Sequence, residues 1–425
     1  MNATPVDATI VDDETSSPVH PIGTLLRRVT FGPDPGQLPR LASRRIGEVA
    51  AELLASTDDT LPAADAERLR ALGDDDGSEE TLVAFALSRV VTPSTGIHER
   101  LVWYWHGHLT TSLDKVPPPL VARQHLLIRR HALGDFRQLM AAIVRDPAML
   151  VYLDGDGSIG EKPNENLARE LLELFTLGRG HYGEDDVKAG ARALSGWWVD
   201  WDTGEAVFDP DSHADGTWRF LGRRVRDVDD VVDAACDHPA CAPFVAGRLF
   251  HHLVGTEPSP ARLDQLAGVF RRADLAILPL VEAIVTSPEI TDPARGRPTL
   301  PLEWMATAAR ALGVGADAID PWWLITLGQL PFYPPNVAGW PLDGRWLGGH
   351  QVAGRLAAAL ELADTVDPDR LHVPDAATAL ALCGRTLISP TTRSVLDRIG
   401  DGLDPETASI LRLVAALVSP EVSVR

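Results

Sequence analysis

The stretch LMAAIVRDPAML, residues 139–150, contains the pattern from which much of this chain is built. Its apolar residues recur at the three- and four-residue spacing of a helix. Asp146-Pro147 then ends the helix, because proline disfavours helical geometry at the preceding residue and is accepted in the first turn of the next helix. LVEAIVTSPEI (280–290) and LVAALVSPEVSV (413–424) repeat the arrangement. The three segments predict helix–corner–helix joints.

Helical spacing extends over most of the remaining chain, whereas strand signals are sparse. The exception is residues 198–220, where aromatic residues and Val alternate with polar residues around Gly-containing turns, as in a hairpin. We therefore predict an all-α fold: one large multi-helix domain over residues 20–425 with a small β-hairpin insertion. The alternative is that this domain is subdivided near residues 225 and 360. Residues 1–19 are polar, acidic and aperiodic, which predicts a disordered leader.

Charge and composition exclude several classes of function. The chain has 60 acidic and 39 basic residues, a net charge of -21, so a nucleic-acid partner is not expected. No run approaches the roughly 20 apolar residues of a membrane span. The chain begins without the basic and apolar regions of a signal peptide, so we expect it in the cytoplasm, or exported only in complex with a signal-bearing partner.

The polar face of the helix expected at residues 163–178 is the first candidate site. Asn166, Arg169, Glu170 and Glu173 form one stripe. The opposite, apolar stripe consists of Leu167, Leu171, Leu174 and Phe175. Two carboxylates one turn apart resemble the metal-binding pairs of helical bundles. The alternative is a solvated face with the ion pairs Glu165–Arg169 and Arg169–Glu173, each contributing about 0.2–0.5 kcal/mol.

Histidines supply the second part of this candidate site. His106 and His108 would share a face only on extended chain, which a break at Gly107 would permit. Together with the two glutamates, and with His181 as a further ligand, they would form a mixed site for iron, manganese or zinc. The alternative is that both histidines form hydrogen bonds inside an aromatic core.

A third candidate lies in the segment PPNVAGW, residues 334–340, and the residues that follow. Asn336, Trp340 and Trp346 are candidate contacts to a substrate or a partner, because Trp stacks on sugars and anchors protein interfaces. The alternative is that these large side chains only fill a core.

Several long segments resemble a bacterial family catalogued as domain of unknown function 1800. The most distinctive is PNENLARELLELFTLGRGHYGEDDVKAGARALSGW (163–197). LLRRVTFGPDP (25–35), LVWYWHGHLTTS (101–112), LGQLPFYPPNVAGWP (327–341) and SPEVSVR (419–425) also match, in the expected order. Members of that family are often encoded beside a phosphatase/sulfatase-like protein, so the resemblance implies such a partner.

Two functional hypotheses follow from the sequence. The first is a metal-dependent enzyme, an oxidoreductase or hydrolase, whose His/Glu ligands are supported by Asn166 and Arg169. The second is a non-catalytic partner of a phosphatase/sulfatase-like protein that binds through Trp-rich loops. The first predicts that the polar groups converge on one buried pocket. The second predicts that they hold helices together while an exposed, Trp-bearing patch remains.

Overall fold

The computed structural model describes residues 19–41, 43–55, 61–73, 76–92, 96–367 and 371–425. They form the expected all-α fold with two short antiparallel hairpins. The expected leader, residues 1–19, lies outside the described residues except for Val19, the first residue of α1. The helices are α1 (Val19–Val29), α2 (Gln37–Leu41), α3 (Ile46–Ala55), α4 (Ala63–Arg70), α5 (Asp76–Val91), α6 (His98–His108), α7 (Pro118–His131), α8 (Phe136–Ile143), α9 (Pro147–Tyr152), α10 (Asn166–Glu170), η1 (Leu171–Thr176), α11 (Glu184–Ala193), α12 (Val228–Cys236), α13 (Cys241–Val254), α14 (Pro260–Arg272), α15 (Ile277–Val285), η2 (Pro288–Thr291), α16 (Pro301–Leu312), η3 (Ala316–Ala318), α17 (Trp322–Thr326), η4 (Gly344–Leu347), α18 (Gly349–Asp364), α19 (Ala376–Leu382), α20 (Pro390–Arg398), α21 (Pro405–Leu417) and α22 (Pro420–Ser423).

The three proline joints are confirmed. The helices α8, α15 and α21 each end shortly before a proline that opens the next short helix, at Pro147, Pro288 and Pro420. At the first joint the Asp146 carboxylate accepts a hydrogen bond from the Met149 N–H at 3.1 Å, which caps the new helix. Proline therefore places each corner, and at the first corner an N-cap reinforces it.

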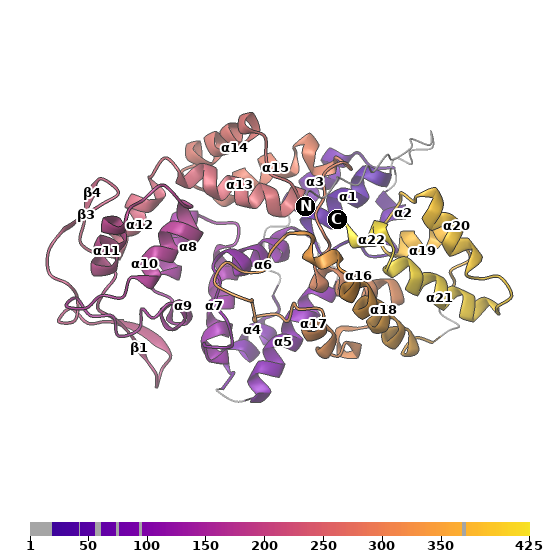
Figure 1. Cartoon of the computed structure of the whole chain (residues 1–425), viewed down its shortest axis with the longest axis horizontal. Helices are drawn as coiled ribbons and strands as arrows, with labels where there is room; N and C mark the ends of the chain where they lie inside the picture. The colour runs from indigo at the N-terminus through magenta and orange to yellow at the C-terminus, as the bar shows by residue number, and fades with distance from the viewer. Residues whose placement is uncertain (1–18, 42, 56–60, 74–75, 93–95, 368–370) are drawn as a thin grey trace, which may run out of the picture.

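The expected hairpin is present, and a second one follows it. Strands β1 (Trp197–Asp200) and β2 (Glu205–Phe208) pair with Trp198 opposite Val207. Strands β3 (Trp218–Phe220) and β4 (Arg223–Val225) form the other pair. Both hairpins lie at one end of the molecule, on the left in Figure 1.

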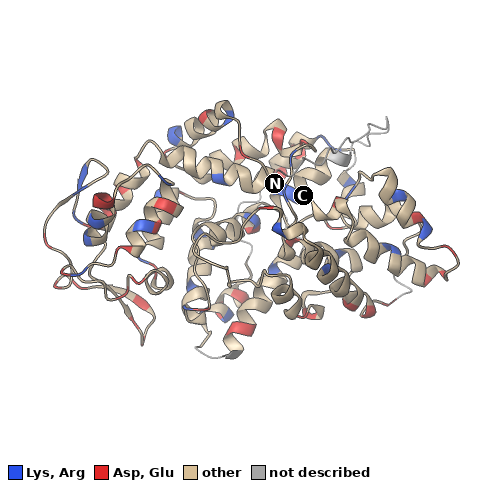
Figure 2. Cartoon of the chain, viewed as in Figure 1, with Lys and Arg blue, Asp and Glu red and all other residues tan. Residues whose placement is uncertain are grey.

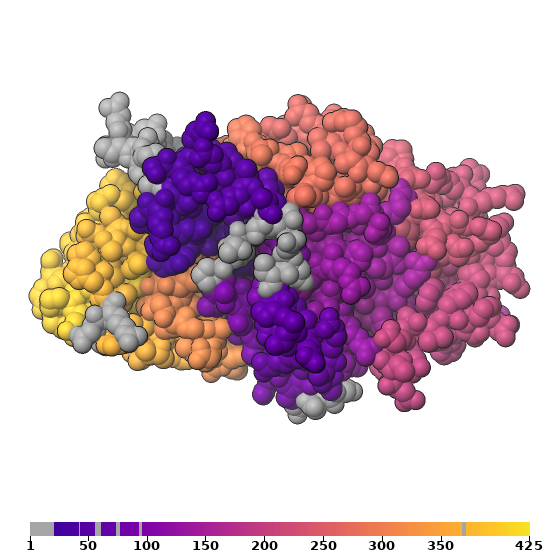
Figure 3. All heavy atoms as spheres, turned by 180° about the vertical axis from the view of Figure 1, so that it is seen from behind, coloured from indigo at the N-terminus to yellow at the C-terminus, as the bar shows by residue number. Residues whose placement is uncertain are grey.

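The N-terminal helix lies beside C-terminal segments of the chain (Figures 1 and 3). The Arg28 guanidinium donates to the carbonyls of Glu289 and Ile290 at 2.9 and 3.0 Å. Near the other end, Val424 pairs with Pro298 in an isolated bridge. Buried apolar residues from α1 to α22 form a single cluster, which holds these distant segments together.

Acidic and basic residues are interspersed along the helices (Figure 2). In the described part of the chain, no helix is both long and apolar enough to cross a bilayer. The division of the chain near 225 or 360 stays a prediction.

Candidate functional site

A cavity of about 420 Å³ lies where α6, α13, α16 and the loop from Gln329 to Arg345 meet. Its lining combines two of the distinctive sequence segments, the WYWHGH segment of α6 and the NVAGWP segment of the loop. The polar and aromatic side chains at its wall are Phe31, Arg100, Trp103, Tyr104, His108, Arg248, His251, His252, Glu257, Glu303, Gln329, Asn336, Trp340 and Arg345.

Two glycines bring α6 and the loop into backbone contact. Gly339 has a φ of +77°, and a Cβ added to it would lie 2.4 Å from the carbonyl oxygen of Gly107. Only glycine combines this left-handed conformation with such a close approach. A Cβ at Gly107 would meet nothing within 4 Å. The steric requirement therefore falls on Gly339.

A buried ionic cluster reaches the cavity wall through Arg100 and Glu303. Glu303, on α16, pairs with Arg297 at 2.5 Å, with Arg425 at 3.1 Å and with Arg100. Burial alone would raise the pKa of Glu303, but the nearby charges of Arg297, Arg425 and Arg100 hold it well below its usual value. Burial lowers the pKa of Arg100 to about 10, so this guanidinium is still charged at pH 7.

A wall of neutral rings faces this cluster. Tyr104 stacks on His108, with ring centroids 5.6 Å apart, and meets His252 edge-on at 5.0 Å. Burial, with a smaller contribution from Arg248, lowers the pKa of His108 to about 3, so this ring is neutral. Its Nε2 lies 2.9 Å from the Phe175 carbonyl, which can only accept, so we assign the proton to Nε2.

Several hydrogen-bonding atoms of this lining lack a partner within the described residues. They share deep burial and belong to side chains at the cavity wall. They are Nε and Nη2 of Arg100, Nε1 of Trp103, the Tyr104 hydroxyl, Nδ1 of His108, Nε2 of His252 and Nε1 of Trp340. Because buried polar groups are normally satisfied, such a concentration is typical of a ligand-binding surface.

A His–Glu pair lies at the rim. Helix α13 ends at Gly255, whose φ of +96° reverses the chain and returns Glu257 to His251. The two side chains meet at 2.5 Å through Nδ1 and Oε1. Arg248, one turn earlier on α13, is exposed and forms no ion pair within the described part of the chain.

The expected carboxylate stripe lies outside this cavity. Helix α10 begins at Asn166 instead of near Pro163, and its second half is the π-helix η1. Arg169 pairs with Glu165 at 3.2 Å and with Glu184 at 2.8 Å. Glu173 accepts from Arg179 at 2.6 Å and from the Tyr182 hydroxyl at 2.8 Å.

Two other features of this stripe bear on its role. Glu170 is half-buried, and burial together with Glu173 raises its pKa. The Asn166 amide donates to Asp154 at 3.4 Å. Of the two ion pairs in the solvated-face alternative, Glu165–Arg169 is present, whereas Glu173 pairs with Arg179 in place of Arg169.

The expected break at Gly107 is wrong, since α6 runs unbroken from His98 to His108. On a helix, His106 and His108 point in different directions. His106 Nε2 lies 2.8 Å from His125 Nδ1, whereas His108 contacts η1. His181 is exposed and lies 6.3 Å, centroid to centroid, from His238.

The structure thus separates the expected metal ligands. Among the described residues, no three His, Cys, Asp or Glu side chains are grouped as a metal site would require. Of the loop candidates, Asn336 and Trp340 line the cavity. Trp346 is buried and donates to the Pro341 carbonyl at 2.7 Å, so it holds the loop in place.

Sequence reasoning missed Arg100, Arg248, His251, Glu257 and Glu303. Each lies in an ordinary helical segment or turn, and no short motif marks any of them. One signal could have indicated the rim pair: a His four residues before a helix-ending glycine and a Glu two residues after it, because such a glycine reverses the chain. The ionic cluster joins α6 with α16 and the C-terminal residue, and only the tertiary fold reveals it.

Fold and site together define an all-α protein with a partly aromatic, hydrogen-bonding cavity between helices, where helical proteins bind small molecules. The chain belongs to the family described as "Protein of unknown function (DUF1800)", whose profile matches residues 24–424. No curated protein and no solved structure matches the chain.

Proposed function

We propose that the central cavity is the active site of an enzyme that performs acid–base chemistry on a small molecule. The observation that carries the proposal is the His251–Glu257 pair, which shares one cavity with a set of unpartnered hydrogen-bonding atoms. A base with an orienting carboxylate, beside groups that hold a substrate, is the arrangement that proton-transfer enzymes use.

The roles of the two side chains follow from their geometry. With Glu257 ionised, His251 Nδ1–H donates to it, which leaves the lone pair on Nε2. Nε2 then accepts a proton from the substrate or a water molecule and can return it to a leaving group. Glu257 orients the ring and stabilises the imidazolium, as carboxylates do in catalytic His–carboxylate pairs.

Turnover of natural metabolites tests this proposal. Wild-type protein incubated with a small-molecule bacterial extract should deplete a compound, as detected by mass spectrometry. His251→Asn should abolish this depletion, and Glu257→Gln should slow it, since general acid–base groups contribute about 10²–10⁴-fold in rate. His372→Asn, at an exposed histidine outside the cavity, is the matched control. An extract left unchanged by wild type, or turnover that survives His251→Asn, would refute the proposal.

Metal-dependent chemistry at Glu170 and Glu173, with His106, His108 or His181 as ligands, stays a prediction of the sequence. Elemental analysis of untagged protein tests it. Stoichiometric iron, manganese or zinc in wild type, lost from a folded Glu170→Ala/Glu173→Ala variant, would support it. If the protein stays metal-free after reconstitution with these metals, the predicted metal site is excluded.

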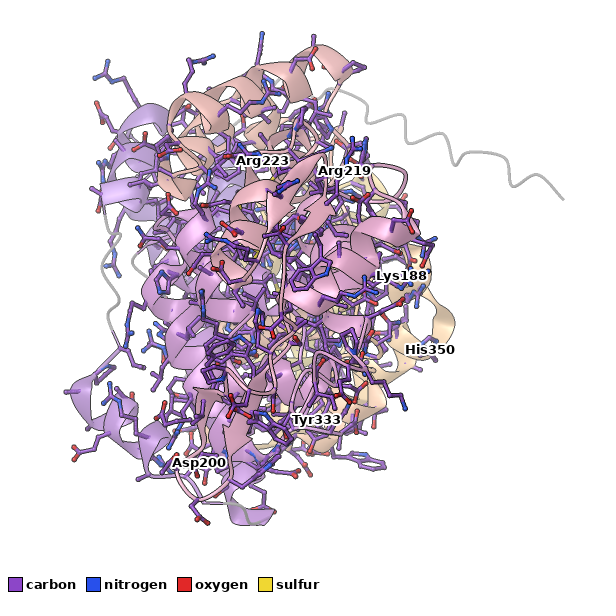
Figure 4. All side chains as sticks on the ribbon, turned by 90° about the vertical axis from the view of Figure 1, so that its left-hand side faces the viewer. Lys188, Asp200, Arg219, Arg223, Tyr333 and His350 are labelled. Atoms are coloured by element: carbon purple, nitrogen blue, oxygen red, sulfur yellow. The ribbon has the colours of Figure 1, made fainter. Side chains whose placement is uncertain are left out.

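Partner binding is the second candidate, and exposed aromatic residues favour it. Trp198 and Trp201 are 41% and 60% exposed on the β1–β2 hairpin, next to exposed Phe208. The hairpin projects at the end of the molecule that Figure 4 faces, where Asp200 is labelled. This surface would bind a phosphatase/sulfatase-like partner, through other tryptophans than the sequence suggested.

Calorimetric titration with such a purified partner protein tests the second candidate. Trp201→Ala should weaken binding about tenfold or more, because exposed aromatic anchors dominate interface energies. Trp322→Ala is the control, since Trp322 is 58% exposed on α17, a different element. Equal affinity of wild type and Trp201→Ala would exclude the hairpin as the interface.

A further inference from the structure

We propose that the molecule bound in the central cavity carries an oxyanion group, a carboxylate, phosphate or sulfate, held between Arg100 and Arg248. This inference rests on the proposed function in one respect: it takes the cavity to be a substrate site. It adds the chemical class of that substrate.

The first step is the excess of guanidinium groups beside the cavity. Arg100, Arg297 and Arg425 all converge on the single side-chain carboxylate of Glu303. All four side chains are buried, with at most 4% exposed. Buried charge is costly unless it is paired, and here three cations share one side-chain anion. An anion in the adjoining cavity would offset this cost.

The second step is the unused hydrogen-bonding capacity of the wall. Arg100 uses Nη1 on Glu303, whereas its Nε and Nη2 have no partner among the described residues. The indole N–H groups of Trp103 and Trp340 are donors only, and both are buried without a partner there. A ligand that satisfies them must present acceptors, and oxyanions present several in a small volume.

Most of the other charged groups of the lining are already paired. Glu257 is engaged by His251 and Glu303 by its arginines, so each carboxylate already has a basic partner. Arg345 pairs with Asp343 at 2.8 Å. Arg248 has no such ion pair within the described part of the chain. Its positive charge nevertheless acts to lower the pKa values of both Tyr104 and His108. Of the described residues, the cavity thus offers one free cation at its mouth and one partly used cation at its wall.

Titration calorimetry of the full chain with inorganic phosphate, sulfate and acetate tests this, each against chloride at equal ionic strength. At least one of the three anions should bind with one-to-one stoichiometry and raise Tm, and the best of them identifies the oxyanion. Arg248→Gln should weaken that binding roughly tenfold or more, the contribution of a charge-assisted hydrogen bond. Trp340→Phe should weaken it less, because it removes one neutral donor.

Arg271→Gln is the matched control, since Arg271 is an exposed arginine on α14 outside the cavity. Absence of binding by all three anions, or binding that Arg248→Gln leaves unchanged, would overturn the oxyanion inference. If the chain then turns over a neutral metabolite, the proposed active site is still supported. If the chain binds an anion but transforms no metabolite, the oxyanion site is supported and the catalytic proposal is refuted.

Discussion

Glu303 is the residue whose loss should destabilise the fold most. Replacing it with Gln leaves three buried guanidiniums without their shared carboxylate, and breaking a buried pair in this way costs about 3–5 kcal/mol. Arg425→Met should cost less, because Glu303 keeps Arg100 and Arg297. Urea unfolding at pH 7 measures both free energies. A larger loss for Arg425→Met would show that the charge balance of the cluster does not govern its stability.

Buried histidines should make the protein acid-sensitive. Burial lowers the pKa of His106 and His108 to about 3 and that of His125 and His252 well below its usual value. Unfolded histidines take up protons near pH 6.5, whereas these stay neutral in the folded chain, so their stability contribution is complete above pH 6.5 and is lost as pH falls. Each contributes up to roughly 1.4 kcal/mol per pH unit.

Asp146 opposes this trend and provides a test of it. Burial raises its pKa to about 7, so the folded chain keeps a proton that the unfolded chain releases near pH 4. Its contribution is therefore greatest at low pH and is lost as pH rises towards 7. Between pH 6.5 and 5, the free energy of unfolding should fall more steeply with decreasing pH in Asp146→Asn than in wild type. The difference in slope should correspond to about one bound proton. Urea titrations across this range measure the slope, and an unchanged slope would contradict the assignment.

At the scale of elements, the contact between α6 and the loop at Gly339 should govern the cavity. Gly339→Ala forces a left-handed alanine against the Gly107 carbonyl, so it should destabilise the protein by about 1–3 kcal/mol and weaken anion binding. Gly107→Ala meets nothing and should be neutral or stabilising, since alanine is the better helix former. Thermal unfolding with and without phosphate compares them. Similar effects for both would argue against this contact.

The elements also show which parts of the structure are predictable. The proline joints depend on local backbone preferences, and so does the left-handed Gly178 (φ +77°) that follows η1, so residues near in sequence determine them. Three members of the apolar stripe, Leu167, Leu171 and Phe175, are buried as their spacing indicates, whereas the fourth, Leu174, is half-buried. The spacing of apolar residues indicates neither the π turn of η1 nor the unbroken end of α6.

The same distinction applies to the site. His108, Asn336 and Trp340 were recognisable because they lie in unusual segments rich in aromatic residues, Gly and Pro. Arg248 and Glu303 lie on ordinary amphipathic helices, where one more charged residue carries no signal. Only packing that brings α6, α13 and α16 together gives these two residues their place at the cavity.

At the scale of the whole molecule, α1 is tied by hydrogen bonds to segments much later in the sequence, which bears on how the chain unfolds. Arg27 donates to the Gly384 carbonyl at 2.5 Å, and Arg28 donates to the Asp292 carbonyl at 3.1 Å. We expect one cooperative calorimetric transition, with equal calorimetric and van't Hoff enthalpies. Two resolved transitions would instead support division near 225 or 360.

The π turn of η1 has a consequence for how one buried imidazole is held. Such a turn is an α-helix that carries one additional residue. Removing one residue from Leu171–Thr176 would let the helix close as an α-helix, but every later position would rotate by about 100°. The carbonyl of Phe175 would then turn away from His108. The additional residue of η1 therefore sets the orientation of the carbonyl to which that imidazole is anchored.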